Sequence, residues 1–149
     1  MQLVVHELET SGQVRQLITV GSKPKMVYAV RALLFRYLAP AGNLYVEIQD
    51  ENGKKIATSA TVSAATIGTG NYWTGYQRFL VTVALKANTS YYVSLKASGY
   101  TFSELAYIGW CNSWEIKNVF ESDYDGAVGM AAPLGVQLWA YRTQNKGNL

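Results

Sequence analysis

Hydrophobic and polar residues alternate along several stretches of the chain, with the period of two that β-strands produce. The clearest stretch, residues 43–49, has three aliphatic side chains at alternate positions: Leu44, Val46 and Ile48. Because successive side chains of a strand point to opposite faces, these three are predicted to line one face of a half-buried strand. The pair Asn52-Gly53 follows and is typical of a tight turn, so residues 54–60 are expected to return antiparallel with Ile56 pointing inward.

Two further alternating stretches, residues 79–86 and 91–96, are separated by the polar residues 88–90 and are expected to form a second hairpin. The first of them places apolar side chains on one face: Phe79, Val81 and Val83. We expect this face and the aliphatic face of residues 43–49 to share one sandwich core. Shorter β-rich runs occur at residues 105–110, 114–120 and 136–142. The whole pattern predicts an all-β, antiparallel chain of about eight to ten strands.

Residues 26–38 carry apolar side chains at both odd and even positions, which leaves two interpretations open. Five of them would also form a helical stripe: Met26, Val30, Leu33, Leu34 and Tyr37. We favour a strand, because the segment is rich in Val, Tyr and Phe and the rest of the chain offers sheets to join. A strand that is apolar on both faces needs cover on both, from the N-terminal segment or from a neighbouring subunit.

The composition narrows the class of protein. The 149 residues suffice for one domain, and with 49% hydrophobic and 15% charged residues the chain is expected to fold around a core. The net charge is only +3, too little for a domain whose affinity comes from neutralising phosphates, so nucleic acid is not expected as a partner. The single Cys111 excludes an internal disulfide and a four-cysteine zinc site, and we expect it to be a buried thiol.

Neither a signal peptide nor a membrane span is indicated by the hydropathy pattern. The first residues, MQLVVHELETSGQV, lack a positively charged flank and a long apolar run, and no stretch approaches the ~20 apolar residues of a membrane span. We therefore expect a soluble chain that is synthesised in the cytoplasm without a signal peptide and has no membrane partner.

Catalytic constellations are sparse in the sequence. His6 is the only histidine, it lies far from Cys111, and no serine occupies a nucleophile-elbow motif. Asp123 and Asp125, beside Glu121, could form an acid pair of the glycosidase type, although adjacent acids in a Gly-containing stretch more often form a solvated loop. We therefore expect the protein not to be an enzyme.

Aromatic side chains gather in two turn-rich segments. The rings considered for a glycan platform are Tyr72, Trp73, Tyr76, Trp110 and Trp114. Exposed rings of this kind can stack on the apolar faces of sugars. Tryptophan and tyrosine also fill sandwich cores and subunit interfaces, which is the commoner use of such residues.

A resemblance to known proteins begins with the strand NLYVEIQDENGKKIATS and the Ser/Thr-rich loop that follows it. The aromatic strand YWTGYQRFLVTVAL, the segment KANTSYYVSLKASG and the final GVQLWAYR complete the pattern. Together they resemble the jelly-roll β-sandwiches of phage virion proteins and of carbohydrate-binding modules attached to secreted bacterial enzymes. The first 24 residues match no part of this pattern. We therefore expect an N-terminal arm at residues 1–24, a jelly-roll sandwich at 25–142 and a C-terminal tail at 143–149.

A calcium ion is the only cofactor considered. Residues 121–126 place three acids at alternate positions before a glycine, as in the opening of a calcium loop. The twelfth position is Ala132 instead of a bidentate glutamate, which excludes an EF-hand. An irregular site at Asp123 and Asp125 remains open, and the resemblance to jelly-roll binding modules implies that such a structural ion can occur.

The function that the resemblance implies is a non-enzymatic structural role in a bacteriophage virion. A capsid decoration protein or a tail-surface component is the first interpretation. A carbohydrate-binding module, or a receptor-binding tail-fibre domain that contacts a surface glycan, is the second, and a soluble enzyme is a distant third.

Two β-prone patches near the N-terminus are candidates for assembly. They could each add a strand to an exposed sheet edge, in the same chain or in a neighbour: Leu3, Val4 and Val5, and Leu17, Ile18 and Val20. We expect both termini to be held by packing against partners. These contacts predict a homo-oligomer seated on phage capsid or tail proteins, and the resemblance to jelly-roll virion proteins favours a trimer.

Overall fold

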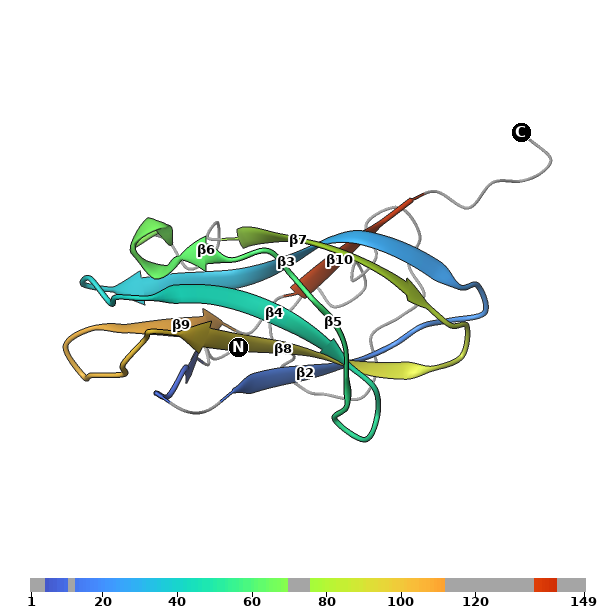
Figure 1. The fold of residues 1–149 in the computed structure, drawn as a ribbon, viewed down its shortest axis with the longest axis horizontal. Helices are drawn as coiled ribbons and strands as arrows, with labels where there is room; N and C mark the ends of the chain where they lie inside the picture. The colour runs from blue at the N-terminus through green and yellow to red at the C-terminus, as the bar shows by residue number, and fades with distance from the viewer. Residues whose placement is uncertain (1–4, 11–12, 70–75, 112–135, 142–149) are drawn as a thin grey trace, which may run out of the picture.

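The structure is a computed structural model that describes residues 5–10, 13–69, 76–111 and 136–141. Within these residues, strands from distant parts of the chain form two five-stranded antiparallel sheets (Figure 1). The first sheet contains β1 (Val5–Glu7), β9 (Tyr107–Cys111), β3 (Lys25–Tyr37), β10 (Val136–Ala140) and β7 (Tyr76–Leu85). The second contains β2 (Val14–Thr19), β8 (Ser90–Ser98), β4 (Asn43–Gln49), β5 (Lys55–Thr58) and β6 (Val62–Ser63). The predicted all-β, antiparallel sandwich is confirmed.

The core lies between the two sheets and is built from alternate residues of their strands. Leu44, Val46 and Ile48 of β4 are fully buried in it. Phe79 and Val81 of β7 belong to the same cluster, against which Val83 packs. The two faces predicted to share one core therefore do so.

The hairpin of β4 and β5 is also confirmed. Its turn is held by the Asp50 carboxylate, which accepts hydrogen bonds from the N–H groups of Asn52 and Lys54, both at 2.9 Å. The prediction that Ile56 points inward is wrong, since its side chain is 42% exposed. Ala57 stands directly opposite the buried Ile48, and residues paired across an antiparallel ladder share a face, so Ala57 points to the core instead.

The predicted second hairpin does not form, because β7 and β8 belong to different sheets. β7 pairs with β3, whereas β8 pairs with β2 and β4. The alternating pattern identifies the inward face of each strand correctly but carries no information about which strand lies beside it. The connection between them crosses from one sheet to the other, where the Asn88 N–H donates to the Gly21 carbonyl at 2.8 Å.

The ambiguous segment at residues 26–38 is the long strand β3, as we favoured. Its inner face contributes Val30 and Leu34 to the main core. Its outer face carries Leu33 and Phe35, which form a second buried cluster with Cys111. This second cluster explains why the segment is apolar at both parities.

The N-terminal segment pairs with other strands of its own chain, the first of the two options that its sequence left open. β1 pairs with β9 and β2 pairs with β8. Leu8, Ile18 and Val20 are buried in the main core. The segment from Val5 onward thus lies within the sandwich, while Leu3 and Val4, like the C-terminal tail, fall outside the described residues.

Candidate functional site on the outer face of the second sheet

The aromatic residues predicted to form a glycan platform are not brought together by the described part of the structure. Tyr76 lies at the start of β7, half-buried against the outer cluster of the first sheet. Trp110 is fully buried in the main core, so its ring presents no surface to a ligand. Tyr72, Trp73 and Trp114 fall outside the described residues.

The residues considered for calcium, Asp123 and Asp125, also lie outside the described residues. Within the described ones, no group of three or more His, Cys, Asp and Glu side chains could hold a metal ion. In the N-terminal patches, Ile18 and Val20 are buried in the core and Leu17 is half-buried on the opposite side of β2.

The buried thiol predicted at Cys111 is confirmed, since its side chain is free and completely buried. Burial disfavours the thiolate and raises the pKa of Cys111 to about 11. The thiol is therefore protonated at neutral pH and is a poor nucleophile.

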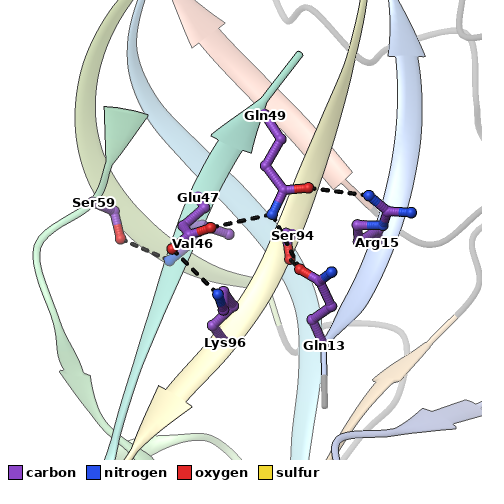
Figure 2. Close-up of polar contacts among 8 residues, drawn as sticks. All are labelled: Gln13, Arg15, Val46, Glu47, Gln49, Ser59, Ser94 and Lys96. Carbon is purple, nitrogen blue, oxygen red and sulfur yellow. Dashed lines mark hydrogen bonds and ion pairs between the residues drawn. The ribbon is translucent and has the colours of Figure 1, made fainter. Parts of the chain in front are cut away.

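Polar side chains from three neighbouring strands meet on the outer face of the second sheet (Figure 2). We call the following residues the polar cluster: Gln13, Arg15, Glu47, Gln49, Ser94 and Lys96. The ladder positions them, because Arg15 of β2 stands opposite Ser94 of β8, which in turn stands opposite Glu47 of β4. Since every second residue of each strand faces outward, the cluster occupies the reverse side of the residues that build the core.

Gln49 is the centre of the hydrogen-bond network in the polar cluster. Its side-chain nitrogen donates to Gln13 Oε1 and to Glu47 Oε1, both at 3.1 Å. Its oxygen accepts a hydrogen bond from Arg15 Nη1 at 3.2 Å. Ser94 Oγ donates to the same Gln13 oxygen at 2.6 Å. The network thus ties the segment before β2 to β4 and β8 (Figure 2).

Charge and aromatic surface complete the site. Lys96 Nζ lies 3.4 Å from Glu47 Oε2, in an ion pair whose lysine side chain is 34% and whose glutamate side chain is 10% exposed. The Arg15 guanidinium lies 4.0 Å above the ring centre of Tyr92. Glu47, Gln49 and Ser94 are buried in this network. The groups that the site can present to a ligand are therefore the exposed side chains of Gln13 and Arg15 and the half-buried side chains of Tyr92 and Lys96, which include both hydrogen-bond donors and acceptors.

Sequence reasoning missed this site because it considered only the aliphatic face of residues 43–49, and Glu47 and Gln49 lie on the opposite face. Both are buried, at 8% and 3% exposure. The sequence did contain a signal, since polar residues occupy alternate positions in residues 13–15, 47–49 and 94–96. Joining these three signals needs the register between strands, which periodicity does not provide.

The described part of the chain contains no helix long and apolar enough to cross a membrane. Comparison with models of protein families gave no match, and comparison with curated proteins gave no significant match. The chain is therefore placed by its architecture, as an antiparallel β-sandwich, and its function has to be argued from its surfaces.

Proposed function

We propose that the chain is a non-enzymatic structural component of a bacteriophage particle, a capsid decoration or tail-surface protein. The proposal rests on one observation, which is the position in the fold of the segment that resembles jelly-roll virion proteins. Residues 44–99 supply all or most of β4, β5, β6, β7 and β8, and so four of the five strands of the second sheet. The part of the chain that resembles such proteins thus builds most of the second sheet of the sandwich.

Contacts between copies and with the shell would use the open edges of the sheets. β2 and β5 end the path of paired strands in the second sheet, and an edge strand can accept a strand from a neighbour through backbone hydrogen bonds. On β5, Ile56 adds an aliphatic side chain that is 42% exposed. Pairing at this edge would bury it, in a homo-oligomer for which we propose a trimer.

Co-sedimentation with phage particles assembled without this chain tests the proposal. The purified full chain should attach to the particles. Ile56→Lys should weaken attachment, because a charge on an edge strand opposes pairing, whereas Leu105→Lys, at a loop position that is 69% exposed, should not. Full-length chain that stays in the supernatant at saturating concentration would overturn the proposal.

Carbohydrate binding, in a binding module or a receptor-binding tail-fibre domain, is the second candidate function, and the polar cluster favours it. Its exposed Arg15 guanidinium lies over the ring of Tyr92, and that ring could contact the apolar face of a sugar. A glycan array probed with the full chain tests it. Glu47→Gln and Tyr92→Ala should abolish a positive signal, whereas Tyr37→Ala on the other sheet should preserve it. An array without signal, or a signal that neither variant weakens, would dispose of this candidate.

A further inference from the structure

Two arginines stand side by side on the outer face of the first sheet. Arg31 of β3 and Arg78 of β7 are direct partners in the antiparallel ladder. Like charges in this position destabilise a sheet. In the part of the chain that the structure describes, neither guanidinium forms an ion pair, and Arg31 Nη1 donates instead to the neutral Gln137 side chain at 2.9 Å. Among the described residues, therefore, no carboxylate compensates this pair of cations.

Aromatic rings surround the arginine pair. The Arg31 guanidinium lies 4.7 Å from the ring centre of Tyr76 and 5.1 Å from that of Trp139, and the Arg78 guanidinium lies 5.9 Å from the Trp139 ring. These contacts offset part of the repulsion. Trp139 Nε1 is screened from solvent and has no hydrogen-bond acceptor among the described residues. A buried donor without an acceptor is unusual in folded proteins, so this N–H is a second group that gains from an incoming acceptor.

Exposed apolar side chains extend the surface beyond the arginines. Met26 of β3 is 44% exposed, Leu80 of β7 is 57% exposed and Tyr141, after β10, is 62% exposed. The Tyr141 ring packs against that of Tyr28, with ring centres 4.9 Å apart. We call the following residues the aromatic–arginine face: Met26, Tyr28, Arg31, Arg78, Leu80, Trp139 and Tyr141. Its composition of Trp, Tyr, Arg and Met is that of the residues enriched in protein interfaces and their hot spots.

We propose that the aromatic–arginine face docks a second protein that presents an acidic residue flanked by apolar residues. A carboxylate placed over Arg31 and Arg78 would accept hydrogen bonds from both guanidiniums and cancel their repulsion. The same acidic segment would lie beside the Trp139 ring, whose centre is 5.1 Å from the Arg31 guanidinium. The apolar neighbours of the acid would cover Met26, Leu80 and Tyr141, which a small inorganic anion could not do.

The charge of the face argues for a different protein as the partner and against a second copy of this chain. A symmetric dimer through this face would bring two copies of the arginine pair into one interface, where none of the residues of the face is a carboxylate that could offset them, and the chain as a whole carries a net charge of +3. The inference rests on the proposed function only in identifying the partner as a particle protein. The binding chemistry itself can be tested without particles.

A pair of synthetic peptides provides the test. One carries two aspartates flanked by leucines, and its counterpart carries asparagines in their place. Titration into the 15N-labelled full chain is followed at the indole N–H signal of Trp139, which is assigned from its loss in Trp139→Phe. We expect the aspartate peptide to shift this signal and the asparagine peptide to leave it in place.

Matched variants separate specific docking from general charge attraction. Arg31→Gln and Arg78→Gln should each weaken binding of the aspartate peptide about tenfold or more, since each removes a charge-assisted hydrogen bond. Lys54→Gln, in the exposed turn of the second sheet, lowers the net charge by the same amount and should leave binding unchanged. The rest of the same spectrum shows whether each variant is folded.

Four outcomes would overturn the inference. The first is that millimolar aspartate peptide does not shift the Trp139 signal, and the second is that both peptides bind equally well. The third is that both arginine variants still bind the aspartate peptide as tightly as the parent chain. The fourth is that the Trp139 signal shifts with the concentration of the chain when no peptide is present, which would indicate a second copy as the partner. If the peptides fail in any of these ways while the chain still attaches to particles, the docking inference falls and the proposed function stands. If the aspartate peptide binds as expected but the chain does not attach to particles, the docking inference stands and the proposed function falls.

Discussion

Replacing Tyr100 with Phe removes a single oxygen that joins the N-terminal segment to β9. The Tyr100 side chain is 5% exposed, and its hydroxyl donates to the Leu8 carbonyl at 2.8 Å and accepts from the Ile108 N–H at 3.0 Å. Phenylalanine keeps the ring but leaves a buried carbonyl and a buried N–H without these partners, and each loss costs about 1–3 kcal/mol. Because the two groups are neighbours and can relax together, we expect the free energy of unfolding to fall by about 2–4 kcal/mol.

Thermal and urea unfolding measure this loss directly. For a chain of this length, 1 kcal/mol corresponds to about 2–4 °C, so the melting temperature should fall by about 5–15 °C. Tyr37→Phe is the matched control, because Tyr37 is 43% exposed and does not belong to either buried cluster. It should melt within about 2 °C of the parent. If Tyr100→Phe is as stable as the parent chain, the N-terminal segment is not anchored in the sandwich as we describe.

Three further changes probe other parts of the sandwich. Val81→Asp should unfold the chain, because an unpaired carboxylate buried in the core costs several kcal/mol; circular dichroism of a soluble, folded variant would contradict this. Gly42→Ala should lower the free energy of unfolding in urea by more than about 2 kcal/mol, since its φ is +97° and the added Cβ would lie 2.6 Å from the Gly99 backbone. Gly68→Ala is the control and should be nearly neutral, because its Cβ would meet nothing within 4 Å. Because the pKa of Cys111 is raised to about 11, the unfolded thiol ionises first, so stability should hold below about pH 9 and fall by about 2 kcal/mol as the pH rises to 11. Burial raises the pKa of Tyr100 as well and acts in the same direction, so Cys111→Ala should flatten only part of the alkaline decline, and an unchanged decline in that variant would contradict the assignment.

The faces of the strands could be predicted from the sequence, whereas their neighbours could not. Alternation identified the buried sides of β4 and β7, because the side-chain period of a strand is a local property of the backbone. It failed at Ile56 and at the supposed pairing of β7 with β8, since both depend on register and on which strands meet. Which strands pair depends on the whole chain, so it cannot be predicted from the side-chain pattern of a single stretch.

The candidate surfaces were harder to predict for the same reason. Glu47 and Gln49 look like solvated residues in the sequence, and become buried only because β2 and β8 bring long polar side chains over them. Arg31 and Arg78 are 47 positions apart and become neighbours only through the ladder between β3 and β7. Trp110 illustrates the opposite case, in which a ring in a turn-rich segment lies in the core.

Mass photometry of the full chain, alone and mixed with the shell proteins encoded in the same genome, tests the central claim that it is a structural component of a particle. We predict a homo-oligomer for the chain alone, with the mass of a trimer, and a heavier species when one of the shell proteins is added. A chain that remains monomeric and associates with none of the shell proteins would contradict the account and favour the carbohydrate-binding alternative.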